Sequence, residues 1–515
     1  MNKVLLLLVG LVLVTYLLFL GRSPVHLNQD ELGFALNAYS INNNGSSFDG
    51  MSYPLYFRHL GEMWATPILV YSAALVLKVW ELSEQNIRFV SVFWGYISVT
   101  IFWLCTGYFL NNNRLRLFSI LLLITTPAFF IHSRLFLDNN IIVPFVLLWF
   151  LVLNHYLSTS KTHLLFWAGL SLGIGVHSYH AAKIAMPLFS ILTIFTIVLH
   201  KSALRLKLIG TALVLFGFIL PLLPLVPWLH AYPDTFIDQI QYTHLFDTSF
   251  GMLTGVGSLI QKQFLLDRMA IYLSYFSPGF LFSSGDNSLV HSTHAVGVFL
   301  TPLIILAPLG VLHVARNMNL RHFLLVMSIA VSPMAASLAG DRYRISRALT
   351  IIPFTILLAI LGLSMLKGKK QTGAIVLVIS LVFLQFDIFL YDYFKDYRIR
   401  SYEAFRYNKH GAFSQLINFA VDKDVDSVYL DKTIPFVTYY WHFYNYMYGT
   451  HYLIKKAYEF DPKNFDSSTS EKSLVLYYFH SISSLTEHIG GYQKIATSYE
   501  SDGTSRFFVF YNSGE

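Results

Sequence analysis

Long apolar runs alternate with short polar segments over residues 1–391 of the chain. Runs of about 17–22 residues suit helices that cross a hydrocarbon layer roughly 30 Å thick. The pattern therefore predicts about eleven membrane-spanning helices. They cover residues 4–20, 87–109, 115–132, 139–157, 164–178, 184–199, 208–228, 296–314, 322–339, 348–366 and 373–391.

Residues 65–80 form a shorter apolar segment that contains Lys78, and it could either cross the membrane or lie along its surface. Short loops rich in Lys and Arg favour the cytoplasmic side of a membrane. All the basic loops fall on one side only if 65–80 does not cross, so we predict an interfacial helix there. These loops are residues 111–116, 158–163, 200–207, 315–322 and 366–372.

With this topology, the outer loops hold most of the side chains suited to chemistry. Three arginines at positions 342, 344 and 347 go against the charge rule, so they call for an anionic partner unless this one loop is misassigned. The outer set is Asp30, Glu31, Arg58, His59, Arg134, Asp138, His177, His180, Lys183, Asp286, His291, His294, Asp341, Arg342, Arg344 and Arg347.

The pattern changes after residue 391, where the apolar runs shorten to strand length. Residues 427–430, 474–479 and 506–511 are rich in Val, Tyr and Phe, which favour strands. Residues 403–420 have the spacing of an amphipathic helix. We therefore predict two domains: a membrane domain at 1–391, and a small soluble α/β domain at 392–515 on the outer side.

The composition supports a membrane protein. Of the 515 residues, 55% are hydrophobic and only 13% are charged, whereas soluble domains have about a quarter charged residues. The net charge of +7 is spread over short loops, so it indicates topology and not nucleic-acid binding. The single cysteine, Cys105, excludes an intrachain disulfide. No small-residue cleavage site follows the first apolar run, so we predict an uncleaved span.

Acids and cations on one side of a membrane bundle suggest chemistry at the boundary between water and lipid. Arginine and lysine suit a phosphate group. A carboxylate suits a general base that activates a hydroxyl or amine. Together they favour transfer of a group from a phosphate-linked donor, which in this setting is itself expected to be a lipid.

Each candidate also has a structural explanation that the sequence leaves open. Asp30 could cap a helix at residues 32–39. Arg134 and Asp138 are four residues apart and could form a helical ion pair. Lys183 could extend from the end of a span to the interface.

The histidines have alternatives of their own. His177 and His180 could pack or form hydrogen bonds at the interface. His291 and His294 with Asp286 could imitate a metal site, but nothing fixes the geometry of a third ligand.

The order of the motifs resembles a known class. Asp30-Glu31 follows the first span, and Arg134 and Asp138 precede the fourth. In this order the chain resembles the membrane-embedded glycosyltransferases of the GT-C class, which use polyprenyl-phosphate sugars. The protein O-mannosyltransferases and lipid A aminoarabinose transferases are the most similar in pattern.

Three later segments extend the resemblance to about residues 1–391. Gly173–Pro187 is similar to a small-residue, aromatic and basic stretch of bacterial members, and Tyr275–His291 is similar to one of their long outer loops. Arg347-Ala348-Leu349 followed by Pro353 looks like their late basic motif. Each motif is short, so the order and common sidedness carry the resemblance.

The resemblance implies a GT-C-like helical bundle with interfacial helices in the first outer loop, and an inverting sugar transfer. Asp30 is then the expected catalytic base, Glu31 the second candidate, and Asp138 a support for the acceptor or the site. The expected phosphate-binding residues are Arg347, Arg344, Lys183, Arg58 and His59, with Arg134 and His180 in support.

The chain departs from the family where a Glu-Lys-Pro-like stretch often follows the first-loop acid. Here the region reads Arg58 to Glu62 and then Thr66-Pro67, which weakens the case for aminoarabinose chemistry. No cofactor is expected, although Asp30 and Asp138 could share a divalent cation. The expected partners are a polyprenyl-phosphate sugar, an unidentified acceptor and the lipid bilayer.

The expected location is the plasma membrane, with the active site and the C-terminal domain outside the cytoplasm. Two other classes stay open at this stage. A transporter or flippase for a lipid-linked anion predicts buried charges at mid-membrane and paired repeats with broken spans. A non-catalytic scaffold predicts that Asp30 and Asp138 are dispensable and far apart.

Overall fold

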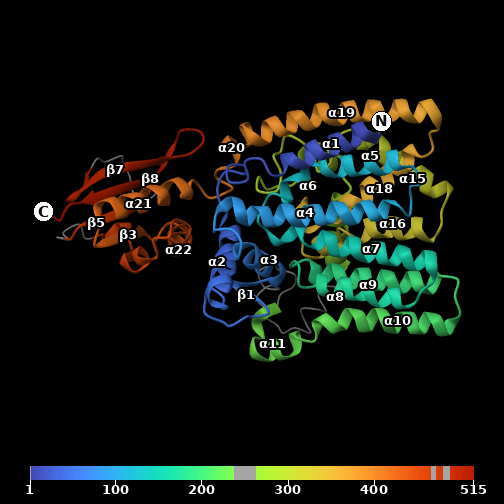
Figure 1. Ribbon diagram of the computed structural model, residues 1–515, viewed down its shortest axis with the longest axis horizontal. Helices are drawn as coiled ribbons and strands as arrows, with labels where there is room; N and C mark the ends of the chain where they lie inside the picture. The colour runs from blue at the N-terminus through green and yellow to red at the C-terminus, as the bar shows by residue number, and fades with distance from the viewer. Residues whose placement is uncertain (1, 237–261, 466–470, 480–487, 515) are drawn as a thin grey trace.

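The computed structural model describes residues 2–236, 262–465, 471–479 and 488–514. Its helices form a bundle whose long members run side by side, with a sheet domain at one end (Figure 1). The first half of the bundle comprises α1 (Asn2–Thr15), α2 (Gln29–Asn44), α3 (Pro67–Leu77), α4 (Glu84–Thr106), α5 (Asn113–Ile124), α6 (Pro127–His132), η1 (Asp138–Asn140), α7 (Ile142–Thr159), α8 (His163–Gly175), α9 (Ala182–Leu199), α10 (Leu204–Ile219), η2 (Leu220–Leu222) and α11 (Leu225–Ala231).

The second half ends in a long helix that runs past the predicted domain boundary at residue 391, to Phe394. Its elements are α14 (Lys262–Ser274), η3 (Phe280–Ser284), α15 (Leu303–Arg316), α16 (Leu320–Val331), α17 (Met334–Leu338), η4 (Ile345–Arg347), α18 (Ile351–Leu363), α19 (Gly368–Phe394) and α20 (Asp396–Ser401).

Six helices of the described chain are long and apolar enough to cross a membrane, and five more apolar helices are shorter. The helical membrane architecture is therefore confirmed, but the count of eleven spans is not. One difference has a clear cause. The run predicted at 115–132 is divided into α5 and α6 at Pro127, which lacks an N–H and begins the second helix.

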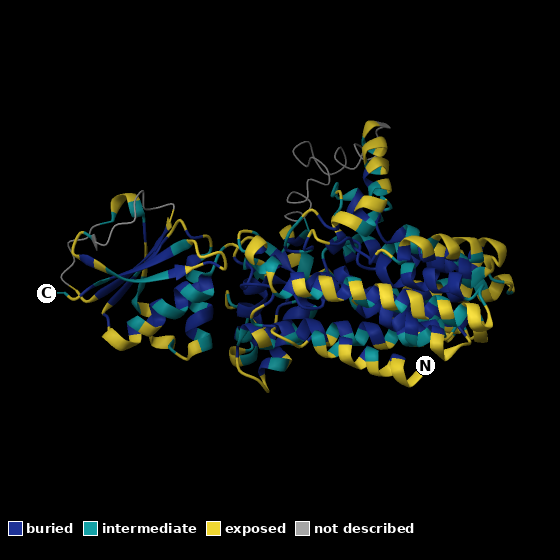
Figure 2. Ribbon diagram, turned by 90° about the horizontal axis from the view of Figure 1, so that it is seen from above, coloured by how far each residue is buried: buried dark blue, intermediate teal, exposed yellow. Residues whose placement is uncertain are grey.

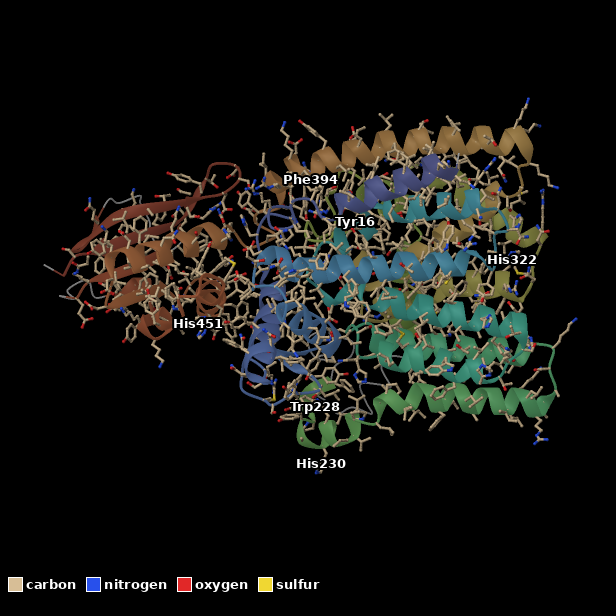
Figure 3. The ribbon with its side chains drawn as sticks, in the orientation of Figure 1. Tyr16, Trp228, His230, His322, Phe394 and His451 are labelled. Atoms are coloured by element: carbon tan, nitrogen blue, oxygen red, sulfur yellow. The ribbon has the colours of Figure 1, made fainter. Side chains whose placement is uncertain are left out.

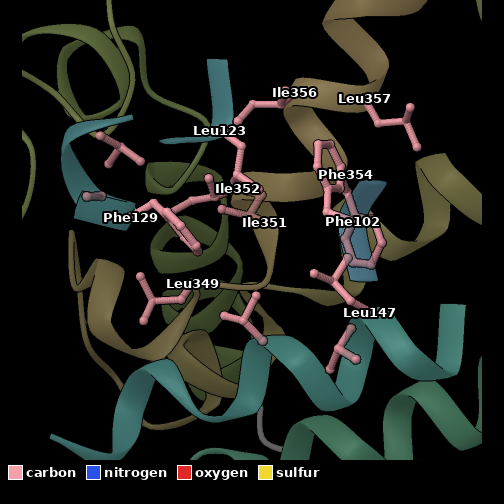
Figure 4. Packing of buried hydrophobic residues seen from close by; sticks show 14 of the residues in the cluster. Phe102, Leu123, Phe129, Leu147, Leu349, Ile351, Ile352, Phe354, Ile356 and Leu357 are labelled. Carbon is pink, nitrogen blue, oxygen red and sulfur yellow. The ribbon is translucent and has the colours of Figure 1, made fainter. Parts of the chain in front are cut away.

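Side chains from distant segments fill the centre of the bundle. Phe102, Leu147 and Phe354 meet there from α4, α7 and α18 (Figure 4). The outer faces of α1, α10 and α19 instead expose apolar side chains. Figure 2 shows exposed residues along the outside of the bundle and buried ones within it. Apolar side chains on the outside of a bundle suit contact with lipid.

The segment between α1 and α4 covers one end of the bundle (Figure 1). Asn28 caps α2 and bonds the amide N–H of Asp30, while the Glu31 carboxylate accepts the Asn28 N–H, which completes a capping box. A hairpin of β1 (Phe57–His59) and β2 (Met63–Ala65) follows. The segment predicted as an interfacial helix forms α3, which packs against α2.

The described residues of the C-terminal domain form a six-stranded sheet in the order β4-β3-β5-β8-β7-β6. β3, β4 and β5 are parallel, and β5, β8, β7 and β6 pair antiparallel. The strands predicted from the sequence appear as β3, β5 and β8. The elements are α21 (Lys409–Lys423), β3 (Ser427–Asp431), α22 (Val437–Tyr448), η5 (His451–Lys456), β4 (Ala457–Phe460), η6 (Pro462–Asn464), β5 (Ser473–Tyr478), β6 (His488–Ile489), β7 (Tyr492–Tyr499) and β8 (Ser505–Asn512).

This domain docks on α2 and on the start of α4. Helix α22 packs against α2, and one hydrophobic cluster contains residues of both domains. The Tyr440 hydroxyl donates to the Leu27 carbonyl at 3.3 Å. The Tyr444 hydroxyl donates to Glu84 at 2.8 Å.

Candidate functional site

Two buried arginines hold the segment that links α1 to α2. Arg134, fully buried, donates to the carbonyls of Thr15, Tyr16, Leu18 and Ser23 at 2.7–2.9 Å. The helical ion pair between Arg134 and Asp138 is not formed, because α6 ends before either residue.

Arg88, on α4, also holds the segment that links α1 to α2. The sequence pattern did not single out Arg88 as a functional residue. Arg88 donates to the carbonyls of Leu20, Pro24 and His26 at 2.7–3.0 Å. It also forms a two-point ion pair with Glu31, with both N···O distances 2.8 Å. Arg88 lies near one end of a predicted span. A charged side chain at such a position needs a partner, and this was the signal in the sequence that pointed to it.

Glu31 is therefore a buried positioning residue in this structure. Besides binding Arg88 and capping α2, its carboxylate accepts the Phe136 N–H at 3.0 Å. The side chain has no exposed surface. These contacts leave Asp30 as the acid of the pair that reaches solvent, with 55% of its side chain exposed.

Asp30 lies beside His59 of the hairpin. The distance from Asp30 Oδ1 to His59 Nε2 is 3.7 Å. The imidazole lies directly over Gly33, where a Cβ would come within 2.6 Å of the ring. Gly33 is one helical turn after Asp30, so its missing side chain is what lets His59 approach the acid.

Asp138 stands at the start of η1 and is buried. The Thr66 hydroxyl donates to its Oδ2 at 2.7 Å. Asp138 also interacts electrostatically with His59, Asp30 and Lys183. The Lys183 ammonium lies over the rings of Tyr56 and Phe236, 5.2 and 4.5 Å from their centroids.

The late basic motif, which begins at Arg347, lies close in space to Asp138. η4 (Ile345–Arg347) packs against η1, which carries Asp138. Arg347 forms an ion pair with Asp341, a partner that the sequence analysis had not assigned. Arg344 is exposed, and both arginines interact electrostatically with His291.

The loop that contains His291 is fastened to the same motif. Asp286 accepts the backbone N–H of Ile345 at 2.6 Å and that of Ser288 at 2.9 Å. Burial raises the pKa of the Asp286 carboxyl above its ordinary value, although these two hydrogen bonds oppose the change. Burial, with the nearby arginines, lowers the pKa of His291 to about 4.

These residues form one group, which we call the charged cluster: Asp30, His59, Asp138, His180, Lys183, His291, Arg344 and Arg347. Burial acts to raise the pKa of Asp30, but His59, His291 and His180 outweigh it, so the pKa lies below its ordinary value. Asp30 is therefore ionised at neutral pH, as a general base must be.

Three predicted site residues lie elsewhere or serve the scaffold. Glu31 and Arg134 are buried in the supports described above. Arg58 points away from His59 along the strand and stacks on Trp64, with its guanidinium 4.1 Å from the ring centroid. In the described ranges, no group of three or more His, Cys, Asp or Glu side chains is placed to hold a metal ion.

Comparison with known proteins adds two findings. Residues 65–228 match the family described as dolichyl-phosphate-mannose-protein mannosyltransferase. The fold matches the crystal structure of ArnT from Cupriavidus metallidurans bound to undecaprenyl phosphate, with a TM-score of 0.56 and 12% identity over 99% of this chain and 98% of that one. The apo structure of ArnT matches with a TM-score of 0.56 and 11% identity over 98% and 97%.

A search of curated proteins gives no significant match. The structural match establishes the fold over both domains, including the sheet domain, for which the sequence showed no resemblance. Together with the family match, it confirms the predicted resemblance to the membrane-embedded GT-C glycosyltransferases. The matched family segment begins in the hairpin and ends in α11, so it includes Asp138, His180 and Lys183.

Proposed function

We propose that the protein transfers a sugar from a polyprenyl-phosphate carrier to an acceptor on the extracytoplasmic face of the plasma membrane. The charged cluster is the observation that carries the proposal. It combines one solvent-accessible, ionised carboxylate with several cations at the end of the bundle nearest the C-terminal domain. The undecaprenyl phosphate bound to ArnT, which shares the fold, supports a lipid phosphate as the donor group.

In the proposed reaction, an acceptor hydroxyl or amine attacks the anomeric carbon from the side opposite the phosphate. Asp30 takes the proton of the acceptor as the new bond forms. The bond from the anomeric carbon to the phosphate oxygen breaks, and the lipid phosphate leaves with the electron pair. Arg344, Arg347 and Lys183 stabilise its charge.

Asp138 has a different proposed role from Asp30. Its Oδ2 accepts a hydrogen bond from the Thr66 hydroxyl, and its carboxylate interacts electrostatically with Lys183. We infer that Asp138 orients Lys183 towards the phosphate and keeps the acid and the cations at a fixed spacing. No metal ion takes part in this scheme, so transfer should persist in a chelator.

The test is transfer of radiolabelled sugar by the purified protein in lipid, with a panel of polyprenyl-phosphate sugars. Asp30→Asn should lower transfer at least about a hundredfold, because it removes the base, while donor binding persists. Asp422→Asn, at an exposed acid of α21, is the control and should transfer normally. Full activity of Asp30→Asn would refute the role of Asp30, and absence of both turnover and donor binding would favour a transporter or a scaffold.

A further inference from the structure

A cavity of about 770 Å³ lies where the membrane bundle meets the C-terminal domain. The segment after α1, the start of α4, helix α20 and two loops of the C-terminal domain enclose it. No member of the charged cluster lines this cavity. Its chemistry is therefore separate from the proposed sugar transfer.

The carboxylates of this junction cavity already have cationic or hydrogen-bonding partners. Glu84 lies 3.0 Å from His410 Nδ1 and accepts from the Tyr444 hydroxyl. Glu500 lies 3.4 Å from His26 Nε2 and accepts the Asn408 N–H at 2.8 Å. Neither acid forms an ion pair with an arginine of the cavity.

Two arginines of the cavity lack such partners. Arg22 and Arg398 both line it, and no ion pair involves either one in the described part of the chain. The Nε of Arg398 is buried and has no hydrogen-bond partner there. Burial lowers the pKa of Arg398, and the nearby charge of Arg22 lowers it further. Two adjacent guanidinium groups with open donors suit an oxyanion, above all a phosphate.

The rim of the cavity is apolar on the side of the bundle. Phe19 lines the cavity with 59% of its surface exposed, and its ring meets Phe394 at 5.8 Å. Figure 3 shows Phe394 near the end of the bundle that faces the C-terminal domain. Beyond this rim, α1 and α19 expose further apolar side chains, among them Val14, Leu384 and Ile388. The cationic site therefore continues into a surface suited to acyl chains.

We propose that the junction cavity binds the phosphate of an anionic phospholipid. Arg22 and Arg398 share the phosphate oxygens, and the acyl chains lie along α1 and α19. The lipid would then connect the loop after α1 with helix α20, next to the interface with the C-terminal domain. A free phosphate would satisfy the arginines but would leave the apolar rim uncovered.

Native mass spectrometry of the purified full-length protein tests this proposal. Phosphatidylglycerol, phosphatidylcholine and glycerol 3-phosphate are titrated in turn against wild type and Arg22→Gln/Arg398→Gln. Phosphatidylglycerol should bind wild type at least about tenfold more tightly than the double variant, because two charge-assisted contacts are lost. Arg22→Lys/Arg398→Lys should bind with intermediate affinity, since lysine keeps the charge without the fork.

Arg205→Gln is the matched control, because Arg205 is an exposed arginine at the start of another peripheral helix. It should retain phosphatidylglycerol as wild type does. Arg22→Gln alone tests the site at an exposed side chain and without disturbing the fold. Equal binding of phosphatidylglycerol by wild type and both glutamine variants overturns the proposal. Binding of glycerol 3-phosphate as tight as that of phosphatidylglycerol overturns the lipid as the occupant.

Discussion

Arg88 and Arg134 each use all five N–H donors of the guanidinium group. Arg88 reaches three carbonyls and both oxygens of Glu31. Arg134 reaches four carbonyls and the Tyr393 hydroxyl. No carboxylate faces Arg134 in the described structure, so carbonyl dipoles take the place of a counter-ion. These two arginines therefore act through the direction of their N–H donors as well as through their charge, because each donor meets its own acceptor.

Arg134→Lys should therefore destabilise the protein although it conserves the charge. An ammonium group has three donors and no planar fork, so at least two of the five acceptors that Arg134 reaches lose their partner. The expected loss is about 2–4 kcal/mol of unfolding free energy. Thermal unfolding in detergent measures it, with Arg205→Lys as an exposed control. Equal melting temperatures for both variants and wild type would contradict the role assigned to Arg134.

His59→Gln should change how transfer depends on pH. His59 contributes to holding the pKa of Asp30 below its ordinary value of 3.8, while burial acts in the opposite direction. Without the histidine, the pKa of Asp30 rises, so the base becomes protonated at a higher pH. The acidic limb of the kcat/KM profile should then move to higher pH. His163→Gln, at an exposed histidine, should leave the profile unchanged.

Among the elements, the pairing of α8 with α10 depends on small residues. A Cβ on Gly169 would lie 2.1 Å from the Val214 carbonyl oxygen, and one on Gly173 would lie 2.3 Å from that of Phe218. From the facing helix, a Cβ on Gly217 would lie 2.2 Å from the Phe166 carbonyl oxygen. Small residues four apart let two membrane helices approach closely. Helix α8 leads into the segment with His180 and Lys183, so this contact also positions the charged cluster.

Gly173→Ala should force α8 and α10 apart. The expected cost is about 1–3 kcal/mol, as for other overpacked interiors. Gly10→Ala is the matched control, because a Cβ there meets nothing within 4 Å and alanine favours the helix. Melting temperatures in one detergent compare the two variants. A Gly173→Ala protein as stable as Gly10→Ala would show that the helices adjust without cost.

The elements also show what the sequence can and cannot predict. Three strands of the sheet follow directly from their runs of Val, Tyr and Phe. Helix α22 has a similar aromatic composition, yet it is helical: Tyr440, Trp441 and Tyr444 are buried against Phe413 of α21, and the hydroxyls of Tyr440 and Tyr444 reach the other domain. Asp30 and Asp138 were predicted to lie on the same side of the membrane, and in the structure the two carboxyl groups interact electrostatically. Glu31 could not be separated from Asp30 by pattern, because its partner Arg88 is 57 residues away.

At the scale of the whole molecule, two His–Glu pairs of the described residues cross the domain interface in opposite directions. The membrane domain supplies His26 and Glu84, and the C-terminal domain supplies Glu500 and His410. His410→Gln combined with Glu500→Gln should weaken docking by about 1–2 kcal/mol. Hydrogen exchange of α22 should then become faster.

Lys423→Gln serves as the control for this experiment, since its exposed ion pair with Asp422 lies within the C-terminal domain. Its exchange in α22 should match that of wild type. Unchanged exchange in the double variant would show that the hydrophobic cluster shared by the domains holds them together without the polar pairs.

The clamp of Arg134 also fixes an order of events during synthesis. The carbonyls that it binds lie 111–119 residues earlier in the chain, and Tyr393 lies 259 residues later. The first loop is therefore synthesised well before Arg134, and Arg134 is synthesised well before Tyr393. Until then, Arg88, which is synthesised earlier than Arg134, is the arginine that can hold the turn before Asp30, through the carbonyls of Leu20, Pro24 and His26. A nascent chain released before α6 would carry the acid of the proposed reaction without the side chain that fixes the carbonyls of Thr15 to Ser23.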